Sequence, residues 1–214
     1  MKKRVWVAGA VIALVLVALA SVGPLMSDVE QPEYDVLSSD EPFEIRQYEP
    51  MIIAKVEVQG EREEAIGQGF RKLADYIFGN NTVQKDIAMT APVQQQAAKV
   101  NQEISMTAPV QQQQAENGQW TISFVMPSKY TLTSLPTPNN AEVQLQRVPG
   151  KRFAAIVFSG NNSQDNVAKH EAKLLQYIQN SGLRAVGPPK YAFYNPPWTL
   201  PFMRRNEVMV ELEE

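Results

Sequence analysis

The sequence contains no cysteine and only one histidine, His170. The absence of cysteine excludes disulfides, zinc–thiolate sites, iron–sulfur clusters and a cysteine nucleophile. With one histidine, a metal site built on several imidazoles is impossible, and a Ser-His-Asp triad would have to use His170. A Gly-rich phosphate loop and a Gly-x-Ser-x-Gly nucleophile elbow are also absent. These absences favour a protein that is not an enzyme.

The chain also lacks an excess of basic residues. It has 23 acidic and 20 basic residues, a formal net charge of −3 and a pI near 5.4. Nucleic-acid-binding domains usually carry a basic excess, so we expect no nucleic-acid partner. With 214 residues, 44% of them hydrophobic and 20% charged, the composition is that of an ordinary globular protein of one domain or two small ones.

Residues 1–26 carry the pattern of a targeting segment. After a basic start, residues 5–26 contain no charge. These 22 residues match the length of about 20 that a membrane-spanning helix needs, which favours an N-terminal membrane anchor. The small-x-small sequence that ends at Ala20 favours a cleaved signal peptide instead. Both alternatives place the rest of the chain outside the cytoplasmic membrane, either anchored to it or periplasmic or extracellular after cleavage. Residues 27–40 form an acidic tether in this interpretation, and residues 41–214 form the domain.

The domain shows the same order of elements twice. Each half has two strands followed by a helix. In the first half these are residues 43–48, 51–58 and 66–77, and in the second half they are residues 143–148, 153–158 and 167–178. In the first helix apolar residues recur at spacings of four, three and four, and the second helix carries Val167, Leu174, Leu175 and Ile178. Further strands are expected at 120–126 and 207–212. This pattern predicts an α+β fold of two pseudo-symmetric β-β-helix units that share one sheet or barrel, with a ligand groove at their junction.

Two shorter features concern individual elements. A ten-residue segment at 87–96 recurs at 104–113 with Met-Thr-Ala-Pro-Val in each copy. Each copy predicts a short strand near a sheet edge or a bulge because of its proline, and its glutamine run predicts a solvated hairpin loop. Gly67 and Gly69 lie in the first helix and predict close packing of that helix on the sheet.

Several longer motifs resemble the SOUL haem-binding protein family. They comprise Tyr76-Ile77-Phe78-Gly79-Asn80, the two Met-Thr-Ala-Pro-Val segments, Ser123 to Ser128, Tyr194 to Thr199, and Arg204 to Val208. The resemblance covers about residues 32–213. It implies a distorted antiparallel β-barrel flanked by two helices and built from a duplicated unit. It also implies binding of haem or another tetrapyrrole in a largely hydrophobic site. Well-known members are soluble intracellular proteins, whereas this leader predicts export.

Candidate haem ligands follow from residue chemistry. His170, on the second helix, is the only residue that could ligate iron through imidazole, and the alternative is a histidine at the border of the core. Arg204 and Arg205 could hold the haem propionates, and the alternative is a solvated turn or an ion pair with Glu207 or Glu211.

Further groups could line the site. Tyr194 and Trp198 belong to an aromatic-proline loop that could stack on a flat ligand. Met89 and Met106 suit an irregular apolar pocket. For both pairs the alternative is core packing. Additional cations that could meet propionates are Lys85, Lys129 and Lys190.

The function expected from these observations is non-enzymatic binding of haem or a related tetrapyrrole in an apolar groove. A second hypothesis is a small hydrolase or isomerase, or a cationic-ligand-binding domain, in which Glu207 is the general base or ligand. Glu207 could equally form a structural salt bridge. A third hypothesis is a structural envelope protein whose pocket is filled by its own side chains.

Overall fold

The computed structural model describes residues 29–83, 102–114, 119–196 and 198–213. The predicted leader, Lys85, Met89 and the first Met-Thr-Ala-Pro copy lie outside these residues. The described elements are β1 (Tyr34–Asp40), β2 (Phe43–Tyr48), β3 (Met51–Val58), α2 (Arg62–Ile77), β4 (Asn81–Thr82), β5 (Val110–Gln114), β6 (Trp120–Val125), β7 (Thr137–Pro138), β8 (Gln144–Val148), β9 (Arg152–Phe158), α3 (Gln164–Asn180), β10 (Ala185–Phe193), η1 (Pro201–Met203) and β11 (Asn206–Leu212).

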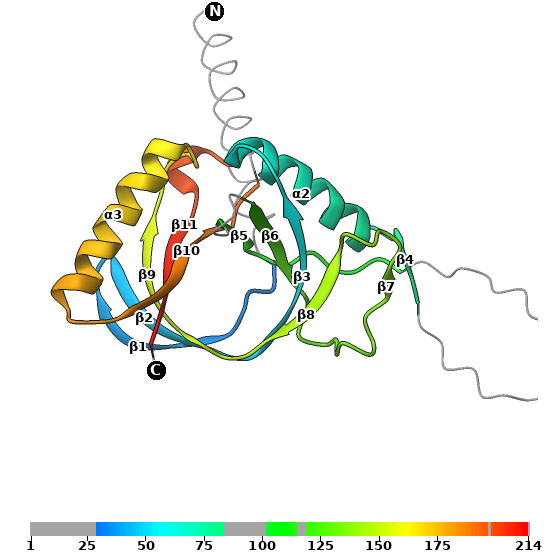
Figure 1. Cartoon of the computed structure of the whole chain (residues 1–214), viewed down its shortest axis with the longest axis horizontal. Coiled ribbons are helices and arrows are strands. Elements are labelled where there is room, and N and C mark those ends of the chain that lie inside the picture. The colour runs from blue at the N-terminus through cyan, green and yellow to red at the C-terminus, as the bar shows by residue number, and fades with distance from the viewer. Residues whose placement is uncertain (1–28, 84–101, 115–118, 197, 214) are drawn as a thin grey trace, which may run out of the picture.

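Nine strands form one strongly curved antiparallel sheet in the order β1-β2-β9-β11-β10-β5-β6-β3-β8, and β4 pairs with β7 separately. Both long helices lie on the convex side of the sheet, and none of the described helices covers its concave side (Figure 1). The prediction of an α+β fold with two flanking helices is confirmed.

The distorted antiparallel β-barrel that the family resemblance implies is not closed in the described residues. The terminal strands β1 and β8 pair only with β2 and β3. Both terminal strands are exposed along most of their length. Their polar residues, among them Asp35, Asp40 and Arg147, suit strands that leave one edge in water. The sheet is therefore curved but open.

The strand order has internal symmetry. When β1 is left out, the order read from β2 matches the order read backwards from β8. In this match β2 corresponds to β8, β9 to β3, β11 to β6 and β10 to β5, so equivalent strands have equivalent neighbours. Gly60 after β3 and Gly160 after β9 both adopt positive φ, at +118° and +110°, before the two helices begin. A duplicated origin of the two halves stays a prediction.

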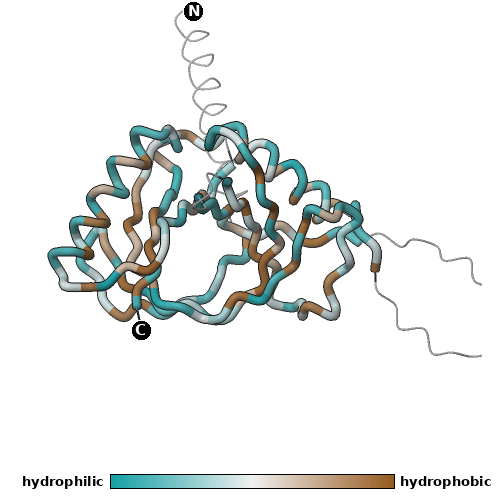
Figure 2. Tube along the Cα trace, viewed as in Figure 1, coloured by the Kyte–Doolittle hydropathy of each residue, from teal (hydrophilic) through white to brown (hydrophobic). Residues whose placement is uncertain are grey.

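Each helix buries its apolar stripe on its own part of the sheet. Leu73 and Ile77 of α2 pack with Ile122 and Phe124 of β6, and α3 is packed in the same way over β9 and β11. Hydrophobic and hydrophilic residues alternate along both helices, while hydrophobic residues recur along the strands (Figure 2). The helix boundaries have local causes: Ser163 caps α3 by accepting a hydrogen bond from the Asn166 amide, and Gly79 at φ +113° follows the end of α2.

The prediction that Gly69 allows close packing is confirmed. A β-carbon at Gly69 would lie 2.9 Å from two carbons of Ile122. At Gly67 it would meet only the end of the Arg71 side chain, at 3.5 Å. Of these two glycines, only Gly69 therefore allows the close approach of α2 to β6.

The glutamine run of the second repeat is not the predicted solvated loop. Gln111, Gln112 and Gln113 belong to β5, which lies between β10 and β6 in the middle of the sheet. Pro109 precedes the strand and so removes none of its ladder donors, which explains why a proline-containing segment is not at an edge. Gln112 is 1% exposed, and its side-chain oxygen accepts a hydrogen bond from Arg62.

Two further features concern the N-terminal part of the chain and the membrane prediction. Residues 34–40, assigned above to the acidic tether, form β1 through main-chain pairing with β2, although only Tyr34 is partly buried.

Neither α2 nor α3, nor any other helix in the described ranges, is long and apolar enough to cross a membrane.

Candidate functional site

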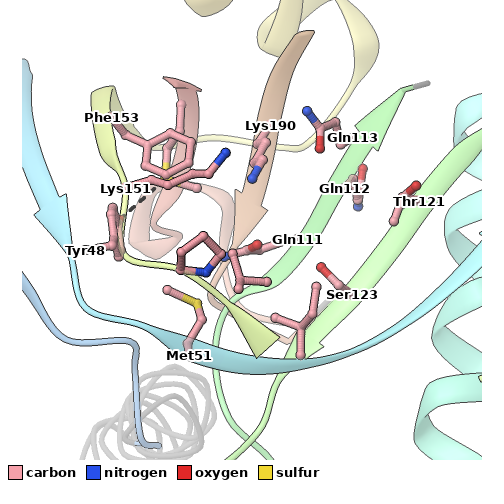
Figure 3. A pocket seen from close by; sticks show the side chains of 14 residues that line it. Tyr48, Met51, Gln111, Gln112, Gln113, Thr121, Ser123, Lys151, Phe153 and Lys190 are labelled. Carbon is pink, nitrogen blue, oxygen red and sulfur yellow. Dashed lines mark hydrogen bonds between the residues drawn. The ribbon is translucent and has the colours of Figure 1, made fainter. Parts of the chain in front are cut away.

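The concave face of the sheet contains a cavity of about 80 Å³ (Figure 3). Its walls come from β2, β3, β5, β6, β8, β9, β10 and β11 and from the turn between β8 and β9. Apolar and sulfur-containing side chains line one part, with Met51, Phe153 and Met209 among them. Lys151, Lys190 and three glutamines of β5 supply the polar part.

A buried network of charged groups lies beside this cavity. Arg46 and Glu207 are both fully buried, and Arg46 Nη1 donates to Glu207 Oε2 at 2.8 Å. The Tyr194 hydroxyl donates to the same oxygen at 2.8 Å. Arg205 donates to Glu207 Oε1 through Nε at 2.9 Å and Nη2 at 2.6 Å. Both oxygens of this carboxylate are therefore saturated by four donated bonds.

The network shifts the acidities of its members. Burial lowers the pKa of Arg46, but the hydrogen bond and negative charge of Glu207 outweigh it and raise the pKa overall. Burial, with the charge of Glu207, raises the pKa of Tyr48 to about 12, and the same two causes raise the pKa of Tyr194. Arg46 and Arg205 thus stay charged and both tyrosines stay neutral at physiological pH. Such an arrangement fixes β2, β10 and β11 to one another.

Glu207 is unsuited to be the general base of the hydrolase hypothesis in this arrangement. Its oxygens face two guanidinium groups and a phenol, and Glu207 lines none of the three described cavities. A base must be within reach of the proton that it removes. The geometry favours the structural salt bridge that the sequence left open.

His170 lies on α3 at the border of the core. Its ring stacks on Phe158 with centroids 4.0 Å apart and an interplanar angle of 7°. Its Nδ1 lies 2.7 Å from the backbone oxygen of Asn166, one turn earlier in the helix. These contacts give the ring a structural role, and iron ligation by His170 stays a prediction.

The two candidate arginines have different surroundings. Arg205 is committed to Glu207 and also lies over the Tyr194 ring, with its Cζ 4.3 Å from the ring centroid. Arg204 is turned towards the loop that precedes it, where its Nε donates to the Thr199 oxygen at 2.7 Å. The two side chains therefore do not form a single cationic clamp, and their contact with propionates stays a prediction.

The aromatic-proline loop divides into a buried and an exposed part. Tyr194 is 7% exposed and belongs to the core of the concave face. Trp198 is 61% exposed, and three more large apolar residues that follow it are also exposed: Leu200, Phe202 and Met203. Four of the twelve exposed large apolar residues in the described part of the chain thus lie within residues 198–203. Met106, 43% exposed, lies apart in sequence from this group.

Two other cavities occur in the described residues. One of about 420 Å³ is lined by Glu30, Glu33 and Glu49 with a single cation, Arg147, so its rim is acidic. Another of about 290 Å³ lies between the first turns of α2 and α3 and is lined by Trp120 and Tyr191, with Glu61, Arg62 and Glu171 as its charged residues. Neither has the surplus of positive charge that a ligand with two carboxylates would need.

Sequence reasoning missed most residues of the concave-face cavity. Lys190 was named only as one of several cations, and Lys151 and Gln111 were not identified. Their common signal is topological, because they come from β10, the β8–β9 turn and β5, which the sheet order brings together. β10 itself escaped prediction because Gly187, Pro188 and Pro189 interrupt its pattern.

Structural comparison defines the class of fold first. The chain is similar to the C-terminal domain of EcmrR, with a TM-score of 0.58 at 9% identity over 85% of this chain and 98% of that one. It is also similar to a hydrolase from Listeria innocua, with a TM-score of 0.52 at 14% identity over 83% of this chain and 94% of that one. At such identities the likeness concerns the fold alone.

The family follows from the sequence itself. Residues 29–211 match the SOUL heme-binding protein family, and the chain therefore belongs to this family. A search of curated proteins gives no significant match.

Proposed function

We propose that this protein binds haem or a related tetrapyrrole without catalysing a reaction, and that it does so outside the cytoplasmic membrane. The observation that carries the proposal is membership of the SOUL family over nearly the whole domain. The export part rests on the uncharged residues 5–26 after a basic start.

The surface of residues 198–203 is the best-supported docking face for the macrocycle. Trp198 and Phe202 are 61% and 74% exposed, and clustered exposed apolar residues mark binding surfaces more often than isolated ones do. A porphyrin offers a flat apolar face, which aromatic rings bind by stacking and area burial at about 25 cal/mol per Å². Arg204 lies beside this loop and supplies a cation for one propionate.

The cavities support an external face over an internal one. The concave-face cavity of about 80 Å³ is far below the roughly 300 Å³ at which small-molecule pockets begin. The cavity of about 420 Å³ is large enough but carries three glutamates against one arginine, and like charges would repel the propionates.

Hemin titration of the full chain in detergent, against a detergent-only blank, tests this proposal. We expect a saturable one-to-one change of the Soret band. The double variant Trp198→Ser/Phe202→Ser should weaken binding at least tenfold. Phe78→Ser is the matched control, because Phe78 is equally exposed at 61% but lies at the end of α2. Uptake that never saturates beyond the blank would overturn the function, whereas saturable binding with equal effects of the two variants would overturn only the site.

A further inference from the structure

The concave-face cavity has a composition unlike that of the proposed haem surface. None of the residues discussed above as haem contacts lines it except Lys190. The charged residues that line it are Lys151 and Lys190, and no carboxylate is among the lining residues. Both lysine side chains lie at the cavity, with Gln111 on the neighbouring strand β5 and Ser123 on β6 (Figure 3).

The two lysines differ in their partners. Lys151 Nζ pairs with Glu211 Oε1 at 2.5 Å. Lys190 has no hydrogen-bond acceptor or ion-pair partner among the described residues, and its Nζ lies 4.9 Å from the centroid of the Phe153 ring. Burial lowers the pKa of Lys190; the charge of Glu211 opposes this effect and the charge of Lys151 adds to it. An anion in the cavity would supply the partner that this ammonium lacks.

The two strands next to β10, β5 and then β6, offer neutral polar groups. Gln111 of β5 and Ser123 of β6 face each other in the strand register, and β10 pairs with β5 on its other side. An amide N–H and a hydroxyl can both donate to a carboxylate oxygen without adding charge. Together with Lys190 they provide one charged and two neutral donors around the same space.

The rest of the lining is partly apolar, and the cavity is small. Lys151, the second cation of the lining, is already paired with Glu211, so one ammonium, that of Lys190, is left to balance a ligand's charge beside the apolar side chains of Met51, Phe153 and Met209. A volume of about 80 Å³ exceeds the roughly 10–15 Å³ needed for one water molecule and is well below that of a drug-sized pocket. The ligand that fits these constraints has a single carboxylate and a short alkyl chain.

We propose that the concave-face cavity is a binding site for short-chain aliphatic monocarboxylates, in which Lys190 is the counterion, Gln111 and Ser123 are neutral donors, and Met51, Phe153 and Met209 contact the alkyl chain. This site is separate from the proposed haem surface and does not depend on it.

Binding of butyrate to the full chain, measured by saturation-transfer NMR and calorimetry, tests the site. We expect saturable binding with a Kd of the order of 1 mM, as suits a ligand of few atoms. Butyramide, the neutral isostere, should bind at least tenfold more weakly, because it lacks the charge that pairs with Lys190. Inorganic phosphate should also bind at least tenfold more weakly, because Lys151 is already paired with Glu211 and phosphate has no alkyl chain to contact Met51, Phe153 and Met209. Affinity for butyrate should fall as the pH rises and Lys190 loses its proton.

Lys190→Met should weaken butyrate binding at least tenfold and raise the thermal midpoint, because it removes an ammonium without a partner. Lys129→Met is the matched control: Lys129 also lies over an aromatic ring, with its Nζ 5.2 Å from the Tyr130 centroid, but it is exposed and outside the cavity. Hemin should not displace butyrate. The proposal is overturned by absence of saturable butyrate binding, by equal binding of butyramide or phosphate, or by an unchanged affinity in Lys190→Met.

Discussion

Arg46 of β2 and Glu207 of β11 form an ion pair that is fully buried, with 2.8 Å between Nη1 and Oε2, although 161 positions separate them in the chain. Their strands do not pair with each other, because β9 lies between them. The pair therefore links two strands that main-chain hydrogen bonds leave unconnected. Arg205, Tyr48 and Tyr194 complete its surroundings.

Glu207→Gln should lower the free energy of unfolding by about 3–5 kcal/mol, because it leaves two guanidinium groups without their carboxylate in a buried site. Urea denaturation followed by circular dichroism measures this change. Glu142→Gln is a matched control: Glu142 pairs with Lys72 at the same 2.8 Å, but both side chains are partly or largely exposed, so its loss should cost far less stability than the loss of Glu207. Equal costs for the two variants would contradict a structural role for the buried network.

Alkaline pH should destabilise the protein between about pH 10 and 12. Burial and the charge of Glu207 raise the pKa of Tyr48 from 10.0 to about 12 in the folded state. Above pH 10 the unfolded chain loses this proton while the folded chain keeps it, so the folded state binds more protons and stability falls as the pH rises. A shift of two units corresponds to about 2.7 kcal/mol in full.

Denaturation midpoints at pH 9, 10, 11 and 12 would show this loss, and Tyr48→Phe should flatten the decline over the same range. The phenolate absorbance of the folded protein should also appear only at a higher pH than that of the unfolded chain, because burial raises the pKa of Tyr76, Tyr191 and Tyr194 as well. An identical slope in Tyr48→Phe would refute the assignment to this residue.

Gly69→Ala should destabilise the protein, whereas Gly67→Ala should stabilise it or leave it unchanged. Both positions lie inside α2, where alanine is favoured over glycine by about 1 kcal/mol. At Gly69 the added carbon would meet Ile122 at 2.9 Å, so α2 must move away from β6, and overpacking of this kind costs about 1–3 kcal/mol. Thermal denaturation of the two variants compares them directly, and a gain in stability for Gly69→Ala would show that the helix is not held this close.

Much of the fold could be read from the sequence because its elements have strong periodic patterns. The predicted strand at 51–58 coincides with β3, and the apolar stripes that predicted the two helices lie within α2 and α3. Strands without an apolar alternation were harder to recognise: β1 is mostly exposed and was assigned to the tether, and the glutamines that make up most of β5 were expected in a loop. Their strand structure depends on pairing with β2, β6 and β10, and such pairing is a long-range property that local residue preference does not reveal.

The candidate site was harder to predict for the same reason. Glu207 was recognised as a possible salt-bridge residue, but its main partner Arg46 lies in a distant strand. The cavity residues Lys151, Lys190 and Gln111 belong to segments that have no shared motif and meet only in the folded sheet. The possible role of a single residue such as Glu207 could be predicted from its side chain. The set of residues that line the cavity could not, because it depends on the order of the strands in the sheet.

His170→Ala should leave the Soret spectrum of the hemin complex almost unchanged and alter the affinity less than threefold. The reason is that the imidazole already stacks on Phe158 and contacts the Asn166 oxygen, whereas the proposed docking surface lies on residues 198–203. Loss of the stacked ring should instead lower the free energy of unfolding by about 0.5–1.5 kcal/mol. Lys169→Ala, at the exposed neighbouring position of α3, should change neither quantity. A His170→Ala protein that folds normally by circular dichroism but no longer binds hemin would make the histidine the iron ligand and move the haem site from the 198–203 loop to α3.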